Sequence, residues 1–189
     1  MNSWRLFIAI PLPEPVKQEL ARAQDALTHA NSHVRGVGLA GMHLTVKFFG
    51  DTPAERVADI GHAMKLTAAT VEKKIRLTCE GIGVFPNVEK PRVVWAGLRG
   101  ETAVLEQMVQ RLELAMETIG FAREERPFHP HVTLGRMKLP KQLGSLHKAM
   151  HQLEGRSFGE FDAEALILYR SDLLPSGARY TVVERAPLP

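Results

Sequence analysis

The sequence HLTV at residues 43–46 returns as HVTL at residues 131–134. Both tetrapeptides read His, apolar, Thr, apolar, and each lies in a short apolar run interrupted soon afterwards by a glycine, Gly50 or Gly135. Side chains alternate between the two faces of a strand, so the His and Thr of each copy are expected on one face and the apolar pair in the core. The two copies therefore predict equivalent strands, one in each half of a chain with a faint internal repeat.

Short apolar runs and segments of helical periodicity surround these two strands. Strands are expected at Trp4–Ile10, Met42–Phe49, Ile75–Ile82, Arg92–Leu98, His131–Met137, Ala165–Tyr169 and Arg179–Val183, and helices at 16–27, 57–64, 101–119 and 143–153. Successive strands occur beside strand–helix alternation, which favours an α+β fold with antiparallel pairing over a doubly wound parallel sheet. No stretch rich in Gly, Ser or Pro divides the chain, so residues 1–189 are interpreted as one domain.

The composition is that of an ordinary globular protein. The chain has 189 residues, of which 44% are hydrophobic and 24% charged, and its formal charge is +3. The single cysteine, Cys79, excludes a disulfide framework and a cysteine-rich zinc site, and its apolar surroundings predict an inert core thiol. Neither a signal peptide nor an apolar run of roughly 18 residues is evident, which predicts a soluble, cytoplasmic protein without membrane contact.

Two imidazoles and two hydroxyls on rigid strands suit acid–base chemistry at phosphorus. One neutral histidine can act as general base and one protonated histidine as general acid, since both states are accessible near neutral pH. The hydroxyls of Thr45 and Thr133 can donate hydrogen bonds to phosphate oxygens. The pattern therefore indicates a phosphodiester substrate attacked by water, with His43 and His131 as catalytic groups and no metal required.

Several other residues have two interpretations. Arg136 is either a ligand of a phosphate oxygen or a solvated arginine at a strand end. Phe7 and Phe48 either stack on a base or pack in the core. His129 and His131 are two residues apart, but no carboxylate or cysteine joins them at metal-ligand spacing, so no metal site is predicted and His129 is expected at the rim of the groove.

The tetrapeptides and their flanks resemble a known family. HLTVKFFG at 43–50 and PHVTLGR at 130–136 are similar to the paired signatures of the two-histidine (2H) phosphoesterases, and in particular to the LigT-like RNA 2′,3′-cyclic phosphodiesterases, also called 2′-5′ RNA ligases. The first strand at 5–10 and the segments 85–86 and 91–95 also resemble that branch, so the similarity extends to about Val183.

The resemblance implies two pseudo-symmetric lobes, each with an antiparallel sheet and flanking helices, around a central groove. It implies hydrolysis of a terminal 2′,3′-cyclic phosphate of RNA to a 2′-phosphate, with His43 as the acid, His131 as the base and Thr45 and Thr133 holding the phosphate. No cofactor and no obligate protein partner are expected. Two alternatives stay open: ligation or binding of 2′-5′ RNA ends, and hydrolysis of a small cyclic nucleotide.

Overall fold

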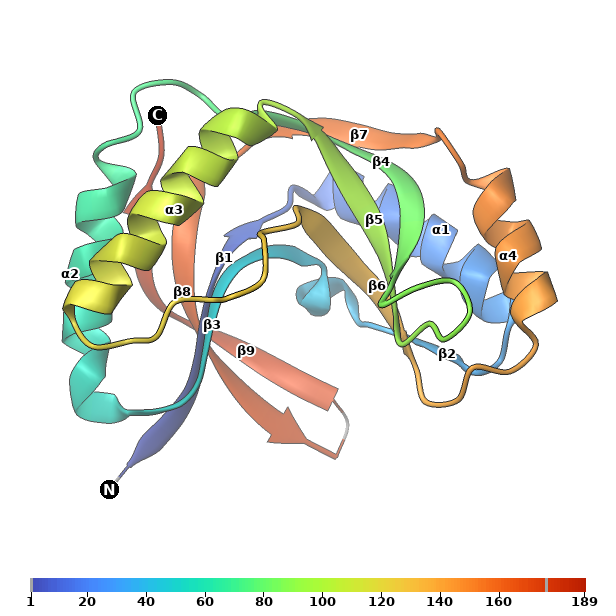
Figure 1. Cartoon of the computed structure of the whole chain (residues 1–189), viewed down its shortest axis with the longest axis horizontal. Helices are drawn as coiled ribbons and strands as arrows, with labels where there is room; N and C mark the ends of the chain where they lie inside the picture. Colours follow the sequence, from blue (N-terminus) through green and yellow to red (C-terminus); the bar gives the residue numbers. More distant parts are fainter. Residues whose placement is uncertain (1, 176) are drawn as a thin grey trace.

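The computed structural model describes residues 2–175 and 177–189 (Figure 1). In these ranges the strands are β1 (Ser3–Pro11), β2 (Val34–Gly36), β3 (His43–Pro53), β4 (Arg76–Phe85), β5 (Val93–Gly100), β6 (His131–Met137), β7 (Ser157–Asp162), β8 (Ala165–Leu174) and β9 (Gly177–Pro187). The α-helices are α1 (Glu14–Ala30), α2 (Val57–Ala68), α3 (Thr102–Thr118) and α4 (Leu143–Gln152), and two short 3-10 turns are η1 (Leu39–Gly41) and η2 (Ala54–Arg56). None of the helices described here has the length and apolar character to cross a membrane.

The strands form two antiparallel halves that meet at one point. One half has the order β7-β4-β5-β6, and the other has the order β3-β1-β8-β9. The short strand β2 pairs with residues 135–137 at the C-terminal end of β6. The halves are joined where Leu44 of β3 pairs with Val132 of β6, and both side chains are fully buried. The α+β fold with two antiparallel lobes is therefore confirmed, and the two sheets are continuous through this pair.

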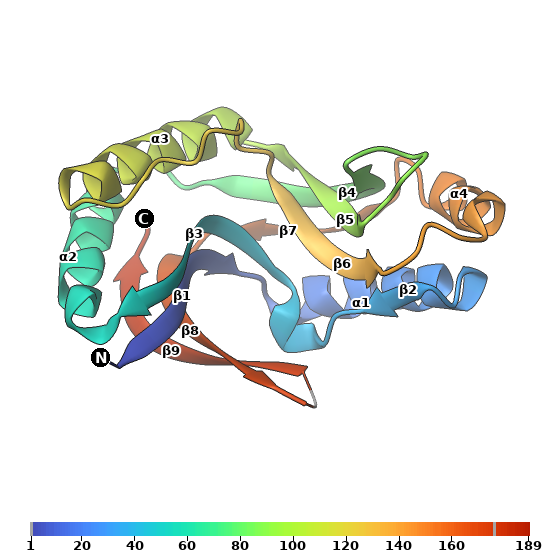
Figure 2. The ribbon, with the colours of Figure 1, turned by 60° about the horizontal axis from the view of Figure 1, so that its bottom comes forward.

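The two halves exchange helices. Helix α1 follows β1 in the chain but packs with α4 on β2, β6 and β7, in the other half. Helix α3 follows β5 but packs with α2 against the half that contains β3, β8 and β9 (Figures 1 and 2). The order β-α-β-α thus occurs twice and accounts for the internal repeat. Each half is covered by a helix that follows, in the chain, a strand of the other half.

The C-terminal hairpin differs most from expectation. The sequence predicts strands at Ala165–Tyr169 and Arg179–Val183, but β8 and β9 continue to Leu174 and Pro187 and project from the body of the protein (Figure 2). The extra residues at the tip, Arg170–Leu174 and Gly177–Ala178, pair within the hairpin, and those at the end of β9 pair with the predicted part of β8, so apolar alternation does not reveal them. The three-residue β2 escapes prediction because it is short, and the edge strand β7 is also not predicted.

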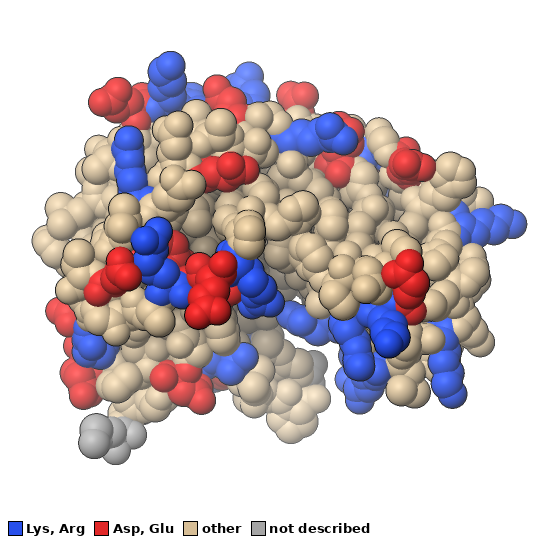
Figure 3. Space-filling view, in the orientation of Figure 1, with Lys and Arg blue, Asp and Glu red and all other residues tan. Residues whose placement is uncertain are grey.

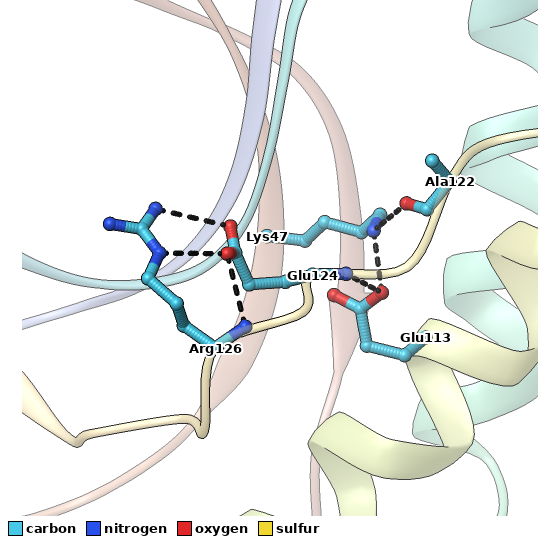
Figure 4. Close-up of polar contacts among 5 residues, drawn as sticks. All are labelled: Lys47, Glu113, Ala122, Glu124 and Arg126. Atoms are coloured by element: carbon cyan, nitrogen blue, oxygen red, sulfur yellow. Dashed lines mark hydrogen bonds and ion pairs between the residues drawn. The ribbon is translucent and has the colours of Figure 1, made fainter.

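A buried ion pair between Lys47 and Glu113 links β3 to α3 and to the segment that leads to β6 (Figure 4). The Nζ of Lys47 donates to Oε2 of Glu113 at 2.6 Å and to the carbonyl of Ala122 at 2.9 Å. The same carboxylate oxygen accepts the backbone N–H of Glu124 at 3.2 Å. Lys47 and Glu113 are only 6% and 9% exposed, so the buried charge of each is compensated mainly by the charge of the other.

Removal of one partner should therefore be costly. Lys47→Met leaves the Glu113 carboxylate buried without its cation and should lower the free energy of unfolding by about 3–5 kcal/mol, measured by urea denaturation. The double variant Lys47→Met/Glu113→Gln removes the uncompensated charge but keeps an acceptor for Glu124, and should be less destabilised. A single variant as stable as the wild type would contradict this role.

Candidate active site

The junction of the two halves brings the two tetrapeptides together. Because β3 and β6 are antiparallel and Leu44 faces Val132, the strand register puts His43 beside Thr133 and Thr45 beside His131. These four side chains lie on the face opposite to the buried pair, and all four are half-buried. The structure thus brings the four predicted site residues to one surface, where each is partly accessible.

A β-bulge occurs at the last residue of the first tetrapeptide. Thr45 pairs with Ala9 of β1, but the next pair joins Lys47 to Ile8, so Val46 is an extra residue in β3. The bulge reverses the alternation that follows it. Lys47 therefore points into the core, and Phe48 returns to the face that carries His43 and Thr45.

The second tetrapeptide has an equivalent bulge. Thr133 pairs with Trp95 and Gly135 with Val94, so Leu134 is the extra residue in β6. Arg136 consequently lies on the face of His131 and Thr133, although simple alternation would put it on the opposite face. The side-chain amide of Gln24 in α1 donates to the bulged carbonyl of Leu134 at 2.7 Å and so supports this geometry.

Aromatic side chains surround His43. Its imidazole stacks on Phe7 with ring centroids 4.9 Å apart and meets Tyr180 of β9 edge-on at 5.4 Å. Tyr169 of β8 also packs on Phe7, with ring centroids 5.3 Å apart, and its ring lies 6.2 Å from that of His43. Burial in this cluster, together with the charge of Lys17, lowers the pKa of His43 to about 4, against the opposing effect of the Ala40 carbonyl.

A second aromatic group surrounds His131. Phe85 and Trp95 meet its ring at 5.0 and 6.2 Å, and the exposed ring of His129 lies 6.3 Å away. Burial lowers the pKa of His131 as well, and the charge of Arg136 acts in the same direction. The indole of Trp95 fits here because Gly83 has no side chain: a Cβ there would lie 2.2 Å from the indole ring.

Backbone carbonyls orient both imidazoles. Nδ1 of His131 lies 2.7 Å from the carbonyl oxygen of His129, and Nδ1 of His43 lies 3.4 Å from that of Ala40. A carbonyl only accepts, so in each neutral ring the proton sits on Nδ1 and the lone pair on Nε2. Each ring can therefore accept a proton through Nε2. Near neutral pH, protonation of either ring requires a nearby negative charge to offset the burial.

The other predicted contact residues have different environments. Phe7 is 4% exposed and supports the imidazole of His43, whereas Phe48 is 53% exposed and lies under the guanidinium of Arg5, 4.7 Å from the ring centroid. Arg136 is exposed, on the face of β6 that carries Thr133. In the described ranges, no three His, Cys, Asp or Glu side chains gather as metal ligands would.

Sequence reasoning does not identify three residues that shape the site: Gln24, Tyr169 and Tyr180. Each reaches the site from a distant element, and no local motif marks it. Cys79, by contrast, is fully buried, and burial raises the pKa of its thiol to about 12, as expected for an inert core cysteine.

Comparisons with known proteins agree with this architecture. The family model of the 2′-5′ RNA ligase superfamily matches residues 12–173. An RNA 2′,3′-cyclic phosphodiesterase of Methanothermobacter thermautotrophicus is 32% identical over 180 residues, which are 95% of this chain and 96% of the relative. A protein of the same name from Thermus thermophilus is 33% identical over 193 residues and covers 97% of this chain and 90% of the relative.

Two crystal structures have the same fold over nearly the whole chain. One is a Thermus thermophilus protein with a TM-score of 0.81 and 31% identity, covering 97% of each chain. The other is apo E. coli LigT, with a TM-score of 0.76 and 26% identity, covering 100% of this chain and 99% of that one. The fold and the twin His-x-Thr strands define a two-histidine phosphoesterase. Within that class, the chain belongs to the 2′-5′ RNA ligase superfamily.

The environment of the imidazoles can be tested by NMR titration, with the two ring signals assigned through His43→Gln and His131→Gln variants. In the free protein, the His43 ring should stay neutral on acidification until about pH 4, because burial disfavours its charged form. His131 should also titrate below its usual value of 6.5. Added inorganic phosphate should raise both pKa values. A free-protein His43 that titrates at 6.5 would show that the ring is not desolvated.

Proposed function

We propose that the protein hydrolyses the 2′,3′-cyclic phosphate end of RNA to a 2′-phosphate by two-histidine acid–base catalysis. The observation that carries the proposal is the strand register at the junction, which puts each histidine beside the threonine of the other tetrapeptide. The names of the relatives from Methanothermobacter and Thermus support this choice of substrate.

The proposed reaction needs one proton acceptor and one donor. Nε2 of His131 takes a proton from water, and the water oxygen bonds to phosphorus. The bond from phosphorus to the 3′ oxygen breaks, and the imidazolium of His43 gives its proton to that oxygen. The Thr45 and Thr133 hydroxyls and the Arg136 guanidinium hold the non-bridging oxygens, which carry the negative charge.

The low pKa of His43 constrains this assignment. A histidine whose pKa is about 4 is almost entirely neutral at pH 7, whereas the acid must carry a proton. The anionic phosphodiester supplies the missing interaction, because an opposite charge within about 4–6 Å favours the protonated form. The acid is therefore proposed to become charged when the substrate binds, and burial keeps the ring neutral before that.

Single alanine substitutions test the two-histidine mechanism. His43→Ala and His131→Ala should each lower kcat by about 10²–10⁴, the usual contribution of a general acid or base, with chelator present throughout. The substrate is an oligonucleotide that ends in a 2′,3′-cyclic phosphate, and a mononucleoside cyclic phosphate is assayed beside it. Circular dichroism checks that the variants fold. Near-normal turnover by either variant would contradict the mechanism.

A leaving group that needs no proton separates the acid from the base. When sulfur replaces the 3′ oxygen of the cyclic phosphate, the thiolate departs unprotonated, so removal of the acid matters less. The ratio of the wild-type rate to the His43→Ala rate should then be at least about tenfold smaller than with the oxygen substrate. His131→Ala should stay impaired, because water must still be deprotonated. The reverse pattern would exchange the two roles.

A further inference from the structure

Four cationic side chains form a strip beside the His131 half of the site. We call Arg35, Arg92, Arg136 and Lys138 the basic ridge; all four are exposed. Arg35 of β2 pairs with Arg136 of β6 in the strand register, and Nη1 of Arg92 donates to the carbonyl of Lys138 at 3.2 Å. Figure 3 shows Lys and Arg side chains gathered beside a hollow in the surface, in the region of β2 and the end of β6.

The charges of the basic ridge are not neutralised by the protein. Among residues 2–175 and 177–189, the ion pairs within 4.0 Å include none of the four ridge residues. Glu89 lies in the loop before Arg92 and is exposed, but within those same ranges it forms no ion pair with the ridge. Like charges directly opposite each other on neighbouring strands are destabilising, so the Arg35–Arg136 pair opposes folding unless an anion lies between them.

The close approach of β2 to β6 makes this pair possible. Gly36 faces Gly135 in the register, and a Cβ on Gly135 would lie 2.8 Å from Cγ1 of Val34. The bulge at Leu134 then turns Arg136 to the face of Thr133, and its partner Arg35 shares that face. Arg35 and Arg136 therefore continue the surface that carries His131 and Thr133, and Arg92 and Lys138 adjoin them at the end of β6.

The other side of His131 has the opposite charge. An open hollow of about 510 Å³ includes Trp95 and His129 and is also lined by Glu80, Glu106, Glu154 and Arg99. Arg99 is already paired with Glu80 at 3.1 Å, which leaves the hollow acidic. A chain of phosphates that enters the site is therefore attracted over the basic ridge and repelled from the hollow.

We infer that the basic ridge binds the phosphate backbone of the nucleotides that precede the reacting end, so that the protein favours a single-stranded polynucleotide over a mononucleotide. This inference rests on the proposed function for the identity of the reacting end. Arginine and lysine contacts to a single strand act through phosphate charge and counterion release, which makes binding depend on salt but not on base sequence. Arg35, Arg92 and Lys138 then determine substrate length, whereas Arg136 also reaches the reacting phosphate.

Binding rather than turnover is the direct test. The probe is a fluorescent single-stranded RNA of about ten nucleotides, within the range of single-strand sites, that ends in a 2′-phosphate. Anisotropy gives its Kd across a salt series, and a nucleoside 2′-monophosphate is measured by competition. Arg35→Gln/Lys138→Gln should weaken RNA binding about tenfold and reduce the slope of log Kd against log salt by about 0.7 for each phosphate that is no longer neutralised. Its affinity for the monophosphate should change less than twofold.

Two further double variants serve as controls. Lys73→Gln/Lys74→Gln removes two exposed lysines elsewhere on the surface and should bind RNA as the wild type does. Arg35→Lys/Lys138→Arg keeps the charge of the ridge and should do the same. Unchanged RNA binding by the Gln variant of the ridge, an equal weakening for RNA and monophosphate, or an equal weakening in the Lys73/Lys74 variant would each overturn the inference.

The outcome for the ridge is separable from the outcome for the proposed function. A wild-type protein that binds RNA through the ridge but does not hydrolyse the cyclic phosphate would refute the chemistry and keep the ridge. A wild-type protein that hydrolyses the cyclic phosphate, with ridge variants that bind RNA normally, would refute the ridge and keep the chemistry.

Discussion

The pairing of Leu44 with Val132 is the contact on which the rest of this structure depends. It is the junction at which the two antiparallel halves become one sheet. It also puts His43 and His131 on one surface, although 88 positions (131 − 43) separate them in the chain. The exchanged helices α1 and α3 hold the junction from both sides, because each packs on the half to which its preceding strand does not belong.

The two bulges extend this symmetry beyond the tetrapeptides. Each adds one residue directly after a threonine, Val46 in β3 and Leu134 in β6, and each turns the residue three positions after that threonine toward the site. The outcome differs between the halves because the returning residue is Phe48 in one and Arg136 in the other. One half therefore presents an aromatic ring, against which Arg5 lies, and the other half presents a cation.

Burial among aromatic side chains lowers the pKa values of both histidines. Phe7 and Tyr180 desolvate the His43 ring, and Phe85 and Trp95 do the same for His131. A desolvated imidazole is neutral in the free protein and responds strongly to an incoming anion, since electrostatic interactions strengthen where water is excluded. The same cluster lowers the pKa of His43, and under the proposed mechanism a bound phosphate then controls whether this ring is protonated.

The amino-acid sequence alone predicted the α+β class, most of the strands and helices, and the common face of His43 with Thr45 and of His131 with Thr133. These features follow from periodicity, which is local. Tertiary structure decided that the two faces coincide, that the bulges turn Phe48 and Arg136 toward them, and that Tyr180 and Gln24 reach the site from distant elements. It also set Arg35 against Arg136. Strand register and bulges depend on which segments pair across the sheet, and no local pattern in the chain records that pairing.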